Sequence, residues 1–156
     1  MKLTSPAFAE GEMVPAKYTC DGDNVSPELV FEEVPEGTAS LALVMDDPDI
    51  PEEVKSARGI EVFDHWVLYE LSADTRSIPE GAFAGRAGVN SRGDERYTGP
   101  CPPREFEPRE HRYFFKLYAL SGTPSFDHPP TKAELEAAIA GMTLAKAELM
   151  GRYARP

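Results

Sequence analysis

Hydrophobic residues in this chain occur in short runs separated by turns, a pattern typical of a β-rich protein. Residues 40–45 (SLALVM) form a nearly continuous apolar run, which predicts a strand buried on both faces. Residues 28–33, 64–71 and 112–120 have the aromatic and aliphatic content of further strands. Because strands outnumber helices, we expect a mainly β fold, antiparallel and Greek-key-like, with a few short peripheral helices.

The remaining segments are less regular. Residues 1–9 predict a short strand, the charged residues 52–60 predict a surface excursion, and residues 72–90 predict a loop with at most a short helix. Residues 144–153 are ambiguous, because alanine, leucine and lysine favour a helix whereas apolar and charged residues alternate as in a strand.

One helix is indicated near the C-terminus. Thr131 is followed three residues later by Glu134, which is the spacing of a capping box. The apolar residues that follow would form one stripe of this helix at Leu135, Ala138, Ile139 and Met142.

Composition narrows the possible partners. The 156 residues are expected to form a single domain, residues 1–156, with a core of ordinary size. A formal net charge of −11 repels phosphate backbones and anionic lipid surfaces, so we expect neither nucleic-acid binding nor stable membrane association. No targeting or membrane-spanning pattern is found, which favours a cytoplasmic location.

The chain has two cysteines, Cys20 and Cys101. Two are too few to indicate a disulfide framework, and their spacing matches no metal-binding motif. Two ordinary thiols are the simplest interpretation of such a pair. Both cysteines, however, lie in stiff loops attached to segments with candidate chemistry, so we also predict that they approach one another near a cavity.

The strand that begins near His111 carries the first candidate chemistry. Alternation places His111 and Tyr113 on the same face, roughly 7 Å apart along the strand. The preceding loop is stiffened by Pro100, Pro102 and Pro103, so it would form a rigid mouth beside them. These residues predict a pocket wall, although residues at the edge of a core would explain the pattern about equally well.

Several segments together resemble a known family. They are GPCPP followed by HRYFFKLYAL, DDPDIP at residues 46–51, HWVLY at residues 65–69, an opening TCDGDNVSPEL and a closing LAKAELMGRY. The chain resembles the phosphatidylethanolamine-binding protein family, in the bacterial and archaeal branch often called Raf-kinase-inhibitor-like. The resemblance spans nearly the whole chain and favours a strand for residues 144–153.

The resemblance implies a small open cavity that accepts an anionic or phosphorylated group. Imidazoles, a phenol and backbone amides would donate hydrogen bonds to the oxygens of this group. Asp47 would hold a histidine in the correct tautomer or accept an amine from the ligand. The residues that match the family's pocket positions are Asp47, Pro51, His65, Gly99, Pro103, His111 and Tyr113.

Some features limit the resemblance. Three aspartates after a strand are more often a solvated turn, and His65 beside Trp66 is more often a core histidine. Residues 104–110 are charged where relatives have a short glycine-containing segment, so the pocket rim is expected to be reshaped. His128 matches no pocket motif and is expected to be a loop residue.

Two functions of different kinds remain. The first is a non-catalytic binding protein for a small anionic or phosphorylated ligand, which modulates a kinase or protease partner, requires no cofactor and forms a homodimer as bacterial relatives tend to do. The alternative is an acid–base or metal-assisted hydrolase. In the first form Asp47, His65, His111 and Tyr113 act as general acids and bases, and in the second His65, His111 and Asp47 hold a metal.

Overall fold

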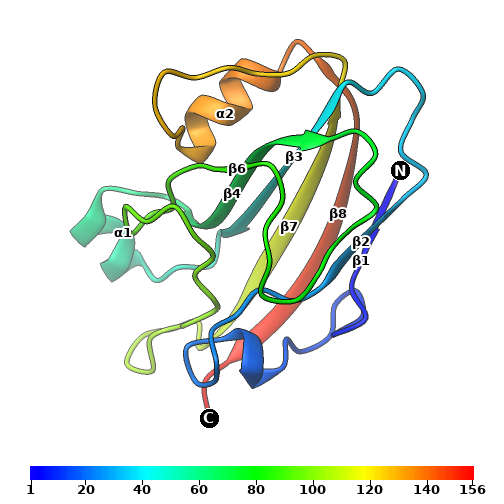
Figure 1. Cartoon of the computed structure of the whole chain (residues 1–156). Helices are drawn as coiled ribbons and strands as arrows, with labels where there is room; N and C mark the ends of the chain where they lie inside the picture. Colours follow the sequence, from blue (N-terminus) through cyan, green and yellow to red (C-terminus); the bar gives the residue numbers. More distant parts are fainter.

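The computed structural model describes residues 1–156 and contains two antiparallel sheets, as Figure 1 shows. The larger sheet has the strand order β6-β4-β3-β7-β8 and the smaller sheet the order β1-β2-β5. The strands are β1 (Lys2–Thr4), β2 (Leu29–Glu32), β3 (Ser40–Asp47), β4 (Phe63–Ser72), β5 (Ser77–Ile78), β6 (Arg86–Ala87), β7 (Glu110–Leu120) and β8 (Thr143–Ala154). The predicted mainly β, antiparallel fold is confirmed.

The helices are short and lie outside the sheets. They are the 3₁₀ helix Ala16–Tyr18, α1 (Glu52–Arg58) and α2 (Lys132–Ile139). In Figure 1, α2 lies over one side of the larger sheet and α1 projects from the molecule. No helix has both the length and the apolar composition needed to cross a membrane.

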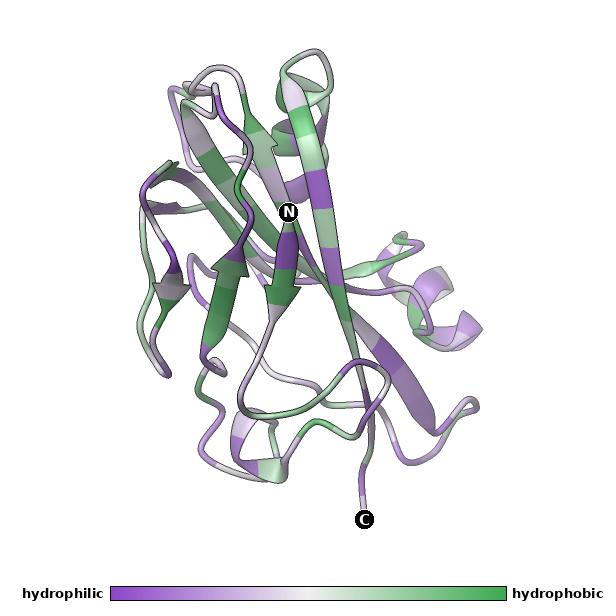
Figure 2. Ribbon diagram, turned by 90° about the vertical axis from the view of Figure 1, so that its right-hand side faces the viewer, coloured by the Kyte–Doolittle hydropathy of each residue, from purple (hydrophilic) through white to green (hydrophobic).

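The central strand β3 is buried along its entire length, as the apolar run predicted. Its alternate side chains Leu41, Leu43 and Met45 belong to the main hydrophobic core, which also contains residues of the smaller sheet. Ala42 and Val44 point to the opposite side and pack with residues of α2. Figure 2 shows the resulting hydrophobic colour along the strands of the larger sheet. The same alternation sends Asp46 and Asp47, at the end of β3, to opposite faces.

The helix α2 covers the second core. Thr131 caps it, because its hydroxyl accepts the backbone N–H of Glu134 while the Glu134 carboxylate accepts the backbone N–H of Thr131. The predicted capping box is therefore confirmed. Of the predicted apolar stripe, Leu135 and Ile139 are buried, whereas Ala138 is exposed. The stripe is narrower than predicted because only one turn of the short helix meets the sheet.

The strand at residues 144–153 is also confirmed. It is part of β8, which pairs with β7 from Glu110 opposite Ala154 to Leu120 opposite Thr143. Tertiary pairing with a long neighbour overrides the helix propensity of its alanine, leucine and lysine residues.

Three local expectations can be compared with the structure. The short strand expected within residues 1–9 is β1. Residues 52–60 lie on the surface as expected, but they contain the helix α1, which was not predicted. Residues 72–90 were expected to be a loop with at most a short helix, but they contain the short strands β5 and β6 and no helix. No residue of α1 is buried, so no apolar periodicity marked it. Strands of two residues, such as β5 and β6, are defined by their partners and leave no pattern of their own.

Cys20 and Cys101 form a disulfide, with their Cα atoms 5.4 Å apart. Their predicted approach is confirmed, and the interpretation as two ordinary thiols was wrong. The two loops lie side by side because the backbone N–H of Cys20 donates to the Pro100 carbonyl at 3.1 Å. Since the bond joins residues 81 positions apart, loop-closure entropy alone would stabilise the fold by about 4–5 kcal/mol.

Thr131→Ala should lower the free energy of unfolding by about 1 kcal/mol, because one backbone donor at the start of α2 loses its acceptor. Urea unfolding measures the change. Thr123→Ala, at an exposed loop position without a side-chain hydrogen bond, serves as the control and should change stability by less than about 0.5 kcal/mol. Equal effects of the two substitutions would show that the cap does not stabilise the fold.

Candidate functional site

A cavity of about 260 Å³ lies beside the ends of β3, β4 and β7. Six of the seven predicted site residues line it: Asp47, Pro51, His65, Gly99, Pro103 and His111. They come from segments far apart in the chain, which meet because β4 and β7 both pair with β3. The structure thus brings the candidate residues to one place.

Asp47 and His111 form a buried pair at this cavity. The Nδ1 atom of His111 is 2.7 Å from Asp47 Oδ2, and its Nε2 atom is 2.9 Å from the Pro108 carbonyl oxygen. Because a carboxylate and a carbonyl are both acceptors, each ring nitrogen of His111 already faces a partner within the protein. Asp47 Oδ1 accepts the backbone N–H of Asp49 at 2.8 Å. The prediction that Asp47 positions a histidine agrees with this geometry, but His111 has no free donor for a ligand.

His65 has the opposite arrangement. Its Nδ1–H donates to the Thr98 carbonyl at 2.6 Å, and Thr98 returns a backbone N–H to the His65 carbonyl. Burial lowers the pKa of His65, partly opposed by the nearby Asp47 charge, so the ring is neutral near pH 7. Its Nε2 atom has no partner within the protein. This nitrogen accepts a hydrogen bond when the ring is neutral and donates one only when it is protonated.

Tyr113 is the predicted site residue that does not line the cavity. It is fully buried behind the cavity, with its ring edge-on to His65 at a centroid distance of 5.3 Å and stacked on His111 at 6.3 Å. Burial strongly raises its pKa, opposed in part by the nearby Cys101 backbone, and the hydroxyl makes no hydrogen bond of good geometry. Its expected role as a donor to the ligand is not seen. Tyr113 supports the two imidazole rings instead.

Gly99 lines the cavity for a steric reason. A Cβ atom at this position would collide with the Tyr18 carbonyl, so only glycine allows the two loops to approach. Its backbone N–H, which could have been a donor to the ligand, is taken by Asn24 Oδ1 at 2.8 Å.

The other two aspartates of the 46–51 segment are also paired. Asp46 accepts from Lys116 at 2.6 Å and Lys132 at 2.9 Å on the opposite face of β3. Asp49 accepts two bonds from the Arg112 guanidinium at 2.8 Å, and this contact lowers the pKa of Asp49. No carboxylate of this segment is left without a partner to bind a cationic ligand.

Arg58 and Arg92 line the cavity and were not predicted. Arg58 is the last residue of the helix α1, which was not predicted, and Arg92 lies in an exposed loop. The Arg58 guanidinium lies over the Phe63 ring, 5.6 Å from its centroid. Functional residues in exposed segments follow no hydrophobic periodicity. Only the positive charge of these two arginines could have indicated them as candidate ligand-binding residues.

The charged residues 104–110 do not line the cavity directly, and the expected reshaping of its rim stays a prediction. Their influence on the site passes through Pro108, whose carbonyl holds His111. No group of three or more His, Cys, Asp or Glu side chains is arranged to hold a metal ion. His128 lies apart from the cavity, near Glu134.

Comparison with known proteins identifies the fold and its family. The family model for phosphatidylethanolamine-binding protein matches residues 4–154. A UPF0098 protein of Chlamydia pneumoniae is 43% identical over 155 residues, covering 98% of this chain and 98% of its relative. A UPF0098 protein of Aquifex aeolicus is 41% identical, covering 99% of this chain and 89% of its relative.

Solved structures agree. The crystal structure of CT736, a phosphatidylethanolamine-binding protein homologue from Chlamydia trachomatis, has a TM-score of 0.90 and 40% identity, covering 99% of this chain and 97% of that one. The structure of Escherichia coli YbcL has a TM-score of 0.86 and 26% identity, covering 99% and 98%. The chain therefore belongs to the phosphatidylethanolamine-binding protein family.

The neutral state of His65 predicts how stability depends on pH. In the unfolded chain His65 takes up its proton near pH 6.5, whereas in the folded protein burial delays protonation to lower pH. Below about pH 6.5 the unfolded state therefore binds more protons at His65 than the folded state does. As the pH falls below this value, His65 lowers the free energy of unfolding. His65→Gln should reduce the loss of unfolding free energy between pH 7.5 and pH 5.

Urea unfolding at the two pH values measures this difference. His128→Gln serves as the control, because the His128 side chain is 63% exposed. It should leave the pH dependence unchanged. If His65→Gln has the same pH dependence as the wild type, the histidine is not held neutral by burial.

Proposed function

We propose that this protein is a non-catalytic binding protein whose cavity captures a small anionic or phosphorylated group. The ligand is bound by Arg58 and Arg92 at the rim and by protonated His65 at the base. Asp47 and His111 fix the shape of the cavity rather than contacting the anion through free donors. This assignment shifts the main anion contacts from His111 and Tyr113 to the arginines.

The arrangement of positive charges is the observation that carries the proposal. Of the 16 lysine and arginine side chains, all but three lie within 4.0 Å of a carboxylate. The three exceptions are Arg58, Arg76 and Arg92, and two of them line the same cavity. In a chain with a net charge of −11, two unpaired arginines at one cavity favour an anionic ligand.

The size of the cavity and its other residues favour a small ligand. Its apolar contacts come from Ile50, Val54 and Phe63. Asp47, the carboxylate in the cavity, already accepts from His111 and from the Asp49 backbone, so it offers little to an ethanolamine group. Inorganic phosphate and phosphorylethanolamine should therefore bind with similar affinity.

The enzyme alternative is supported by one observation. His65 has the geometry of a general base, with Nδ1–H oriented by a carbonyl and Nε2 facing the cavity. No serine or free thiol stands beside it as a nucleophile, since Cys101 is in a disulfide. The metal-assisted form requires His111 to give up one of its two hydrogen bonds, because one ring nitrogen must bind the metal.

Location and protein partner remain predictions. The disulfide argues against the predicted cytoplasmic location, because disulfides are rare in that compartment in most organisms. Modulation of a kinase or protease, which the Raf-kinase-inhibitor-like resemblance implies, rests on that resemblance alone.

Arg58→Ala and Arg92→Ala should each weaken binding of inorganic phosphate about fivefold, or about 1 kcal/mol, because each removes an exposed charge-assisted contact. Isothermal titration calorimetry measures the affinities. Arg76→Ala is the matched control: Arg76 also lacks an acidic partner, but its guanidinium contacts only the carbonyls of Ala73 and Thr75. It should change affinity by less than about twofold.

If all three variants lose the same phosphate affinity, the effect comes from the change in net charge and not from contacts in the cavity. If the wild type does not bind phosphate, the proposal is rejected. Titration with sulfate at pH 6 and pH 8 tests the role of His65, because sulfate keeps its charge over this range. Binding should be stronger at pH 6, and His65→Gln should abolish that difference. Saturable hydrolysis of a phosphomonoester that His65→Gln abolishes would instead favour the enzyme.

We also propose a homodimer formed through the outer edge of β8. Residues 150–152 of this strand are covered by the segment at Gly11–Val14, but residues 143–149 pair with β7 alone. Leu144, 48% exposed, lies on this part. Free strand edges favour pairing with a second chain. Sedimentation velocity at high micromolar concentration should show a dimer, and a monomer at every concentration would contradict it.

A further inference from the structure

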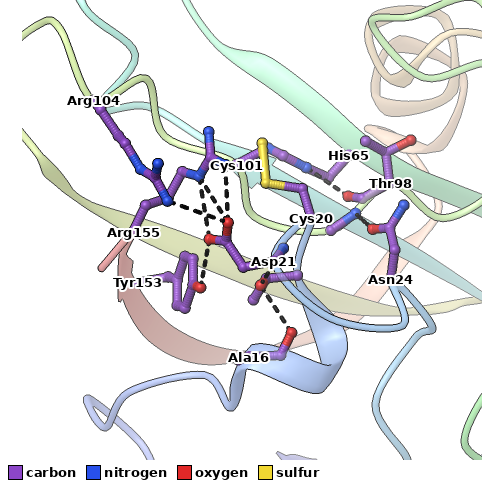
Figure 3. Close-up of a disulfide and its surroundings, with 12 residues drawn as sticks. Ala16, Cys20, Asp21, Asn24, His65, Thr98, Cys101, Arg104, Tyr153 and Arg155 are labelled. Carbon is purple, nitrogen blue, oxygen red and sulfur yellow. Dashed lines mark hydrogen bonds and ion pairs between the residues drawn. A yellow bond between two sulfur atoms is a disulfide. The ribbon is translucent and has the colours of Figure 1, made fainter.

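The disulfide lies at the rim of the cavity, and Cys101 is one of the cavity's lining residues. Cys20 and Cys101 are both exposed, so a small thiol can reach the bond. Figure 3 shows it between the 3₁₀-helix loop and the segment of Thr98, whose carbonyl holds His65. Exposed disulfides are more readily exchanged than buried ones.

The segment that follows Cys101 has few other attachments. Residues 101–107 make no backbone–backbone hydrogen bond. The two residues before them are held more firmly: the Gly99 N–H donates to Asn24 Oδ1, and the Pro100 carbonyl accepts from the Cys20 N–H. Pro102 and Pro103 supply no backbone N–H. The remaining polar contacts are an ion pair in which Arg104 lies 3.8 Å from Asp21, a local contact of the Glu107 carboxylate with Arg109, and the approach of the Tyr113 hydroxyl to the Cys101 backbone. Apart from these contacts and the packing of the buried Pro102, the disulfide is the main attachment of residues 101–107 to the adjoining loop.

The neighbouring loop is itself firmly anchored. Asp21, next to Cys20, accepts from the Tyr153 hydroxyl at 2.8 Å and from the Arg155 guanidinium at 2.9–3.1 Å (Figure 3). The Tyr97 hydroxyl donates to the Tyr18 carbonyl at 2.8 Å. One sulfur of the disulfide therefore belongs to a fixed loop and the other to a loosely held segment, so breaking the bond releases mainly the side that lines the cavity.

We propose that the Cys20–Cys101 disulfide is a redox-sensitive clamp that sets the anion affinity of the cavity. Oxidised protein holds Cys101 and Pro103 in place and binds the anion tightly. Reduction frees residues 101–107, so the ligand must order them again and binds more weakly. This regulation rests on the proposed anion-binding function.

The chemical step is thiol–disulfide exchange with a dithiol. A thiolate of the dithiol attacks one sulfur of the bond, and the other cysteine leaves as a thiolate. The second thiol of the reagent then closes on the mixed disulfide and releases the remaining cysteine. The protein gains two electrons and two protons, and the dithiol becomes a disulfide.

Calorimetry with inorganic phosphate, on oxidised protein and on protein reduced with dithiothreitol, tests the clamp. Reduction should weaken phosphate binding about tenfold, within the usual range of coupling between two sites. Because coupling is reciprocal, saturating phosphate should make the disulfide harder to reduce by about 30 mV. Cys20→Ser/Cys101→Ser should bind as weakly as the reduced protein, with or without dithiothreitol.

The outcomes separate the two proposals. Equal phosphate affinity of the oxidised and reduced proteins overturns the clamp and leaves the anion site intact. Lack of binding in both states overturns the anion site and the clamp with it. A disulfide that resists dithiothreitol in the folded protein is a structural staple, and this result overturns the clamp. Loss of near-ultraviolet circular dichroism on reduction would show that the bond holds the whole fold, which also overturns a local clamp.

Discussion

The alternation of side chains along the buried strand β3 is the constraint on which the site depends. Both faces of β3 are covered, so its two terminal aspartates must each find polar partners on its own side. Asp46 pairs with Lys116 and Lys132 beside α2, and Asp47 is hydrogen-bonded to His111 at the cavity. The strand that anchors the core thereby also fixes the imidazole that shapes the pocket.

This pairing has an electrostatic consequence. The chain is strongly acidic overall, yet the carboxylate in the cavity is matched by an imidazole, and two unpaired arginines stand beside it. Local charges act over a few ångströms, whereas the field of the whole molecule acts over a Debye length of about 8 Å or more. The proposed site can therefore favour a small anion although the net charge of the molecule is strongly negative.

The sequence predicted the fold class and the segments that meet at the cavity, because long strands carry periodic patterns and the pocket motifs resemble a known family. It did not predict which atoms are available. His111 uses both ring nitrogens within the protein, and the Tyr113 hydroxyl is buried behind the cavity. Arg58 and Arg92 lie in exposed segments without periodicity. Hydrogen-bond partners and loop positions are tertiary properties, so residue types alone could not distinguish occupied donors from free ones.

The most direct test of this account is the protonation state of His65, observed by ¹⁵N NMR of the imidazole nitrogens. With three histidines in the chain, the resonances can be assigned by substitution. Near pH 7 without ligand, His65 should be neutral with its proton on Nδ1, and saturating sulfate should protonate Nε2. A His65 ring that is already charged, or one that sulfate leaves unchanged while His111 responds, would contradict the account.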